Sequence, residues 1–280
     1  MSEWQPSADL GALHARARML TQIREFFLQR EVLEVQVPVL GSHTVTDPDV
    51  EAIAVPGYGF LQTSPEYYLK RLLAAGVPSC YQLAPAFRDD EQGRLHNPEF
   101  YLLEWYQLGY DARQLRAEVA QLCDLVLGPA AYQQVAYKDL VADLNAPREQ
   151  LDLAFARACE RLKPGRFFIV DYPADQAALA KVSRTDPSVA ERFELVIDGV
   201  EIANGYHELT DPAEHRRRFA QDNQIRHTRG LVARALDEPF LSALTSGLPE
   251  CAGVALGVDR LLMLSLGADS LDEVMAFRVR

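Results

Sequence analysis

The sequence predicts an α+β protein, in which pairs of strands are combined with separate amphipathic helices. One pair is an apolar run over residues 80–87 that continues, across a very polar loop, into an alternating aromatic run over 100–106. A second pair meets at 198–199, where Asp-Gly between alternating runs is a strong signal for a two-residue hairpin turn. Apolar residues at helical spacing over 10–29 and 111–127 are the third observation.

The composition is that of an ordinary globular protein, with 48% apolar and 24% charged residues. A length of 280 residues allows one large domain or two small ones, with a sizeable core. The net charge of −12 argues against sequence-independent binding to a polyphosphate backbone. We therefore expect no DNA partner.

The sequence also predicts a soluble cytoplasmic protein without a membrane partner. The N-terminus lacks the basic-then-apolar pattern of a signal peptide, and no apolar run approaches the length of a membrane span. Cys80, Cys123, Cys159 and Cys251 have no metal-ligand spacing, and three of them sit in apolar runs. Reduced, buried thiols are the expected state.

The first part of the chain predicts a long helix, a strand and a second helix. The alternating run over 32–40 contains a proline, which restricts that strand to an edge or a boundary of a sheet. The second helix is expected over 67–75, with Ser64 as its N-cap and Pro65 at the first helical position. Glu66 would then be a favourable charge in the first helical turn.

The polar loop before residue 100 carries far more charge than a short connection needs. Arg88 stands at a strand end, where its guanidinium can fork onto phosphate oxygens. His96, Asn97 and the following proline favour a turn beside it. Glu104 lies among aromatic residues, where a carboxylate is costly to bury unless a cation meets it. This stretch therefore predicts an anion and a cation bound together.

The hairpin over 192–208 brings two carboxylates together. Its turn sets Val196 opposite Glu201 and places Glu194 diagonally across from Glu201 on the same face. Oxygen ligands of this kind suit magnesium, but a solvated polar face of an edge hairpin explains the spacing equally well. Beyond the pair, Asn-Gly at 204–205 is expected to break the strand.

Three further stretches complete the reading. The alanine-rich segment over 128–164 is expected to be helical, and a helix starts at 210–214 and extends to about residue 228. The arginines at 216–218 in that helix are interpreted as a solvated face. A glycine-rich strand within 251–266 turns into a helix, which places Arg260 in a first helical turn that favours an anion.

Four of these stretches together resemble the class II aminoacyl-tRNA synthetases, in the form used by lysyl-tRNA synthetases. They are Thr63-Ser-Pro-Glu, the stretch 87–106 as motif 2, the stretch 201–208, and Gly253-Val-Ala-Leu-Gly-Val-Asp-Arg as motif 3. The resemblance implies an antiparallel sheet flanked by helices that holds a bent ATP and an amino acid. It also implies that the first helix and the proline-containing strand are motif 1, the homodimer element.

The resemblance carries residue roles onto this sequence. Arg88 and Arg260 would be the catalytic arginines on the α- and γ-phosphates, Phe100 would stack on adenine, and Glu194 and Glu201 would bind magnesium. The positions that match the ATP site are Arg88, Asp89, Asp90, His96, Asn97, Phe100, Glu201, Ile202, Gly257 and Arg260. The positions that match the lysine pocket are Ser64, Pro65, Glu66, Glu104, Tyr106, Asn204, Tyr206, Glu208 and Ala255.

Three positions depart from the synthetase pattern. Asp90 stands where motif 2 has glutamate, Tyr206 where phenylalanine is usual, and Ala255 where lysyl-tRNA synthetases have glycine. The alanine is typical of a truncated paralogous family, the elongation factor P lysine ligases. The resemblance starts almost at Met1, so we expect a single catalytic domain over 1–280 without an anticodon-binding OB domain.

The resemblance therefore implies that ATP activates a lysine, (R)-β-lysine in particular, as an adenylate. The aminoacyl group would then pass to the ε-amine of a lysine on elongation factor P, with tRNA not a partner. Three alternatives are a free-standing enzyme that charges tRNA, a non-catalytic sensor on a synthetase scaffold, and a generic α+β binding module. The alanine at 255 speaks against the first, and the joint presence of Arg88, Arg260, Glu194 and Glu201 speaks against the others.

Overall fold

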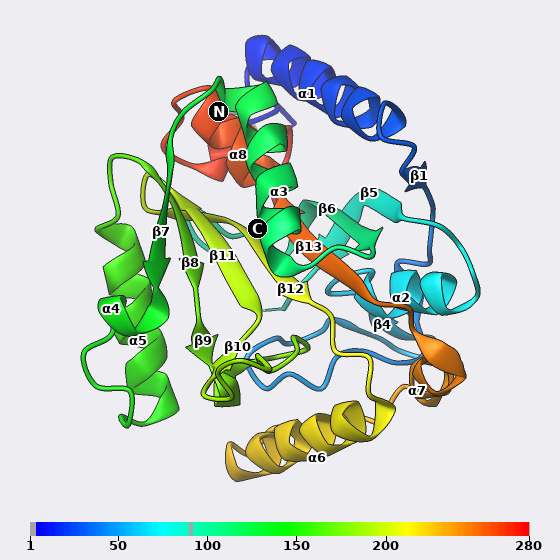
Figure 1. The fold of residues 1–280 in the computed structure, drawn as a ribbon. Helices are drawn as coiled ribbons and strands as arrows, with labels where there is room; N and C mark the ends of the chain where they lie inside the picture. The colour runs from blue at the N-terminus through cyan, green and yellow to red at the C-terminus, as the bar shows by residue number, and fades with distance from the viewer. Residues whose placement is uncertain (1–3, 90–91, 280) are drawn as a thin grey trace. The chain divides into compact units, whose positions relative to one another are not determined.

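The computed structural model describes residues 4–89 and 92–279 (Figure 1). The chain divides into two compact units that interleave along the sequence. The first unit contains the residues up to Tyr106, residues 210–249 and the segment from Gly257 onward. The second unit contains residues 107–209 and 250–256. The single domain over 1–280 stays a prediction.

Several helices of the first unit begin directly after an aspartate N-cap. Helix α1 (Leu10–Leu28) starts after Asp9, whose carboxylate accepts a hydrogen bond of 2.7 Å from the backbone N–H of Ala12. Helix α6 (Pro212–Thr228) has its proline in the first turn, as predicted. The other helices of this unit are α2 (Glu66–Ala74), α7 (Glu238–Gly247), α8 (Val258–Ser265) and the 3-10 turn η2 (Leu271–Glu273).

The arginines at 216–218 lie on a solvated, ion-paired face of α6, as predicted. Arg217 and Arg218 both pair with Glu214, and Arg216 pairs with Glu238 at 2.8 Å. No separate basic patch arises from this run.

The strands of the first unit form two sheets. Strand β5 (Cys80–Phe87) pairs parallel with β1 (Leu33–Glu34) and antiparallel with β6 (Glu99–Leu108). The small sheet has the order β2 (Leu40–Gly41), β4 (Gly59–Leu61), β3 (Ala54–Val55).

The prediction of one strand over 32–40 was wrong, because only its two ends pair as strands. The backbone N–H of Val37 donates to the side chain of Gln82 at 2.7 Å instead of to a neighbouring strand. Pro38 has no N–H to donate. The middle of the run therefore leaves the ladder.

Aromatic packing holds the first unit together. The ring of Phe27 on α1 stacks on Tyr81 of β5, with centroids 4.4 Å apart, and meets Trp105 of β6 edge-on at 5.4 Å. Tyr67 on α2 stacks on Phe240 of α7 at 4.3 Å. Burial of such large rings is a major contribution to the stability of a core.

The second unit is built on a mostly antiparallel sheet flanked by helices. Its strands pair in the order β13 (Cys251–Gly257), β12 (Val200–His207), β11 (Arg192–Ile197), β8 (Arg166–Val170), β7 (Tyr132–Ala136). Helices α3 (Ala112–Leu127) and α5 (Arg148–Glu160) contact β12. The remaining elements are α4 (Tyr137–Leu140), the 3-10 turn η1 (Ala174–Gln176), and the paired short strands β9 (Tyr172–Pro173) and β10 (Val189–Ala190).

Strand β7 corrects the prediction that 128–164 is helical throughout. It pairs parallel with β8, which follows about thirty residues later, a typical crossover separation for parallel strands. The ring of Tyr132 stacks on Phe168 at 5.4 Å, and its hydroxyl accepts from Arg166 at 3.0 Å. These partners are distant in sequence, so no local pattern marks the strand.

The β11–β12 hairpin has the predicted turn. Asp198 and Gly199 have φ angles of 49° and 81°, the positive values that a two-residue turn of this kind requires. Val196 lies opposite Glu201, as predicted. The register shifts between Leu195 and Val196. The prediction that Glu194 lies diagonally across from Glu201 was therefore wrong, because Glu194 lies opposite Asn204.

The prediction that Asn-Gly at 204–205 breaks the strand was wrong, because β12 continues to His207. Gly205 serves packing instead. A Cβ atom there would lie 2.7 Å from Cε1 of Phe193 and 3.0 Å from Cβ of Val254, too close for either contact to be kept unchanged. The glycine therefore lets a fully buried phenyl ring press against the strand.

All four cysteines are buried and free, as predicted. Within residues 4–89 and 92–279, no helix combines the length and the apolar character needed to cross a bilayer.

Candidate functional site

The first predicted arginine lies where β5 ends. Arg88 is the residue after the strand, and its backbone N–H donates to the carbonyl of Pro98 at 2.9 Å. Its guanidinium carbon lies 5.0 Å from the centre of the Phe100 ring, within cation–π range. Asp89 is exposed and donates its backbone N–H to Glu51, whereas Asp90 lies outside the described residues. A half-buried cation is thus fixed at the strand end by an aromatic face.

The second arginine is held by the same loop. Arg260 stands in the first turn of α8, directly after the strand that ends at Gly257. Its Nε donates to the carbonyl of Leu95 at 3.2 Å, and its Nη2 lies 2.8 Å from Nε2 of His96. Asn97 is buried and donates to the carbonyl of Glu99 at 2.5 Å. The structure thus brings Arg260 and His96 together, as the motif 2 and motif 3 resemblance implied.

The residue before Arg260 has a structural role that the sequence did not reveal. Asp259 is buried, accepts the backbone N–H of Tyr101 at 2.6 Å and pairs with Arg16. It therefore joins α1, β6 and α8.

The C-terminal segment braces the loop from the other side, which sequence reasoning also missed. The guanidinium of Arg278 donates to the carbonyls of Gly93 and His96 at 2.8 and 2.5 Å. Arg94 in turn donates to the carbonyl of Asp269 at 2.6 Å. The loop that carries His96 is thus fixed by residues nearly two hundred positions away.

A buried cluster around Glu104 and Glu66, called the acidic pocket below, lies beside the N-terminus of α2. The N-cap is Pro65 rather than the predicted Ser64, because the helix begins at Glu66. The serine side chain has two partners. Ser64 Oγ accepts from the backbone N–H of Glu66 at 3.0 Å and donates to Glu104 Oε2 at 2.7 Å. The hydroxyl of Tyr106 donates to Glu104 Oε1 at 2.8 Å. Both oxygens of Glu104, which is 2% exposed, are therefore occupied.

The pocket contains a cation that the sequence analysis did not single out. Lys70 is fully buried and pairs with Glu66 one helical turn before it. Burial raises the pKa of Glu104, and the charge of Glu66 raises it further. The hydrogen bonds from Ser64 and Tyr106 and the charge of Lys70 act in the opposite direction. These side chains thus form one coupled group of charges.

The predicted carboxylate pair lies in the second unit. Glu194 is 7% exposed and Glu201 is exposed. Burial raises the pKa of Glu194, Arg192 lowers it, and the charge of Glu201 raises it. The two carboxylates are therefore close enough to act on each other, as predicted. Arg192, which sequence reasoning missed, contacts Glu194 Oε1 at 2.6 Å and lies 4.3 Å from the centre of the Tyr172 ring.

The other predicted residues of this unit follow β12. Strand alternation places Asn204 and Tyr206 on one face of the sheet, with Ala255 of β13 opposite Asn204. Glu208, just beyond the strand, is buried, and its backbone N–H donates to the carbonyl of Cys251 at 3.0 Å. Ile202 is buried in the irregular part of the hairpin. Asn204, Tyr206 and Ala255 are thus carried by two neighbouring strands, and Glu208 follows directly after one of them.

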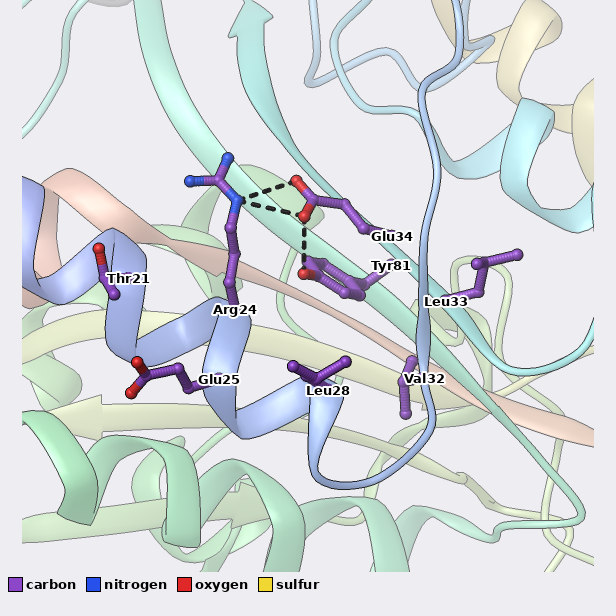
Figure 2. Close-up of a pocket in the computed structure, with 8 residues that line it drawn as sticks. All are labelled: Thr21, Arg24, Glu25, Leu28, Val32, Leu33, Glu34 and Tyr81. Atoms are coloured by element: carbon purple, nitrogen blue, oxygen red, sulfur yellow. Dashed lines mark hydrogen bonds and ion pairs between the residues drawn. The ribbon is translucent and has the colours of Figure 1, made fainter.

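A separate groove lies between α1 and the start of β1, away from the predicted residues (Figure 2). Its volume is about 350 Å³. Arg24 on α1 donates to both oxygens of Glu34 at 3.1 and 3.2 Å, and the hydroxyl of Tyr81 donates to the same carboxylate at 3.0 Å. Leu28, at the rim, is 76% exposed. This groove belongs to the stretch that resembles motif 1.

The comparison with known families decides the classification. Residues 10–279 match the family described as "tRNA synthetases class II (D, K and N)". The chain belongs to this family. The resemblance in the sequence is thus confirmed, and enzymes of this family use ATP and Mg²⁺.

Several curated members of the class II family cover the chain almost completely. A Vibrio cholerae protein is 42% identical over 99% of this chain and 98% of its own length, and one from Vibrio vulnificus has the same identity and coverage. A Salmonella paratyphi A protein is 45% identical over 99% of this chain and 97% of its own length. All three are named elongation factor P--(R)-beta-lysine ligase.

Proposed function

We propose that this chain activates a lysine, (R)-β-lysine in particular, with ATP and transfers it to the ε-amine of a lysine on elongation factor P. The substrate carboxylate attacks the α-phosphorus and pyrophosphate leaves; the acceptor amine then attacks the acyl carbon, AMP leaves and the amine loses a proton. The observation that carries this proposal is the buried acidic pocket of Glu66 and Glu104, in a chain 42–45% identical to proteins of that name. A pocket of this kind suits a substrate with two ammonium groups.

The arginines supply the charge that phosphoryl chemistry needs. Arg88 and Arg260 both lie in the first unit, and each is held by neighbouring groups. We assign Arg88 to the α-phosphate and Arg260 to the γ-phosphate, where they would stabilise negative charge that builds up as pyrophosphate leaves. Asp89, Asp90, His96, Asn97, Phe100, Ile202 and Gly257 complete the proposed ATP site.

The carboxylates of the second unit fit a magnesium ion. Glu194 and Glu201 act on each other electrostatically, and a cation between them would relieve that repulsion. Among the residues that the structure describes, no group of three or more His, Cys, Asp or Glu side chains is placed to hold a metal. Magnesium would therefore take its other ligands from water and phosphates, which it usually keeps. Bound there, it would neutralise phosphate charge.

Nine residues are assigned to lysine binding from the family resemblance. Ser64, Pro65, Glu66, Glu104 and Tyr106 stand in the first unit, and Asn204, Tyr206, Glu208 and Ala255 stand in the second. The methyl group of Ala255 reduces the room for an α-amino acid, which supports the β isomer as substrate.

Homodimerisation is proposed through the motif 1 region. The exposed Leu28 and Leu33 at the groove of Figure 2 are apolar surface that a second copy would cover. A monomer in sedimentation at micromolar concentration would contradict this. The four free, buried thiols support a reducing, cytoplasmic location.

The proposed function is tested by the intact mass of elongation factor P after incubation with this protein, ATP, magnesium and each lysine isomer. We expect a gain of one lysyl group with preference for the β isomer. Glu201→Gln should abolish pyrophosphate release if the magnesium assignment is right. Pyrophosphate release by the wild type without a mass gain would refute elongation factor P as the acceptor of the lysyl group. Charging of tRNA would then be measured.

A further inference from the structure

A buried lysine stands inside the acidic pocket of the first unit. Lys70 is fully buried, a rare environment for a lysine, and it belongs to no predicted set of site residues. We propose that Lys70 is a positioning residue, whose ammonium orients Glu66 and stabilises the ionised form of Glu104 so that both carboxylates can receive the ammonium group of a substrate lysine. This inference rests on the proposed function and deepens its account of the same pocket.

The contacts place Lys70 against both sides of the pocket. It follows Glu66 by one turn of α2, and its Nζ pairs with Glu66 Oε1. The same Nζ lies 5.9 Å from the centre of the Tyr106 ring on β6, and the Tyr106 hydroxyl donates to Glu104. The charged and titratable groups described next to Lys70 include Glu66 on its own helix and Glu104 and Tyr106 on β6.

Two carboxylates in a buried space do not stay ionised on their own. Like charges at short range raise the pKa of one partner, so that a proton is shared between them. Burial and the charge of Glu66 both raise the pKa of Glu104, and the charge of Lys70 lowers it. Lys70 thus opposes the neutralisation of the pocket.

An ordinary structural ion pair is the competing explanation. Exposed ion pairs one turn apart on a helix contribute little to stability, whereas removal of one partner from a buried pair is costly. A purely structural Lys70 would affect folding and every kinetic parameter together. A positioning Lys70 affects the binding of the lysine substrate, and its loss depends on pH.

The test uses lysine-dependent ATP–pyrophosphate exchange by the full-length chain carrying Lys70→Met, with KM measured separately for lysine and for ATP. Burial raises the pKa of Glu104 to about 7, and the charge of Lys70 lowers it. Loss of that charge should raise this pKa further, so at pH 7 the KM for lysine should rise by about threefold to tenfold. The KM for ATP should change less than about twofold, because the change is confined to the amine pocket. Lys138→Met, at an exposed lysine of α4, is the matched control and should leave both values unchanged.

The pH profile separates positioning from structure. A carboxyl pKa raised above about 7 means that the ionised form returns only at higher pH, so the lysine KM of Lys70→Met should fall towards the wild-type value between about pH 7 and about pH 9. The side chain of free lysine stays charged over that range. A lysine KM equal to the wild type, a parallel rise of the ATP KM, or a profile parallel to the wild type would overturn the inference.

Two further outcomes are decisive. If Lys70→Met does not fold by circular dichroism, Lys70→Arg carries the test, because a retained cation should keep the wild-type pH profile. A profile of Lys70→Arg displaced to higher pH would then overturn the role of charge. If the wild type itself shows no exchange with any lysine isomer, the proposed function fails and this inference fails with it. Exchange by the wild type with an unaffected Lys70→Met overturns the Lys70 role alone.

Discussion

Gly205 offers the sharpest structural prediction, because the atoms that an added methyl group would meet are known. In Gly205→Ala, the new Cβ would stand 2.7 Å from Cε1 of Phe193 and 3.0 Å from Cβ of Val254. Both neighbours are buried, with exposures of 0% and 2%, and the Phe193 ring also meets Phe168 edge-on at 5.8 Å. The ring has no open space to move into, so the strands themselves must shift.

Overpacking of this kind costs about 1 to 3 kcal/mol in the free energy of unfolding. We expect the urea midpoint of Gly205→Ala to fall accordingly, with the slope of the transition unchanged. Gly93→Ala is the matched control, since nothing lies within 4 Å of its added Cβ and its backbone is not in the positive-φ region. Equal midpoints for the two variants would refute the packing argument.

Three further predictions concern titration, the loop brace and the pocket floor. Burial raises the pKa of Asp222 to about 6 in the folded protein. The folded state therefore holds a proton that the unfolded state has already lost. The stability that this proton contributes is fully present below the ordinary pKa of the carboxyl and is lost as pH rises through about 6. Asp222→Asn should remove a pH-dependent loss of about 1 to 2 kcal/mol, after allowance for partial exposure, in unfolding measured between about pH 4 and about pH 7. Arg278→Gln should release the loop that carries His96, because it removes the guanidinium bonds to the Gly93 and His96 carbonyls. The KM for ATP in pyrophosphate exchange should then rise by about threefold to tenfold, with the KM for lysine unchanged. An unchanged KM for ATP would show that Arg278 does not hold this loop in place. Ala255→Gly should increase the use of α-lysine relative to β-lysine, and an unaltered ratio would show that the methyl group does not set this choice.

Features coded by neighbouring residues could be predicted from the sequence. The Asp-Gly turn at 198–199 and the helix predicted over 111–127 depend on residues a few positions apart, and both are found where expected. The start of α8 and the buried setting of Glu104 followed in the same way.

What the sequence left hidden depends on partners far along the chain. Local patterning assigns the helix position of Lys70 as readily to the surface as to the core. Its side chain is buried, and the Tyr106 ring of β6 that lies near its Nζ comes more than thirty residues later in the chain. Arg192 and Arg278 likewise gain their roles from contacts across the fold. The irregular register at Val196 has the same origin, because a local alternation cannot show which strand residue is passed over.

The contacts of Asp259 limit how the chain can be divided into fragments and in which order its parts can fold during synthesis. Its carboxylate contacts Arg16 and Tyr101, so segments from early and late in the chain share one buried anion. No contiguous fragment contains the whole first unit, whereas residues 107–209 supply most of the second in one piece. During synthesis on the ribosome, the strands within 107–209 can therefore pair early. Helix α1 and strand β6 cannot contact the Asp259 carboxylate until α8 has been synthesised.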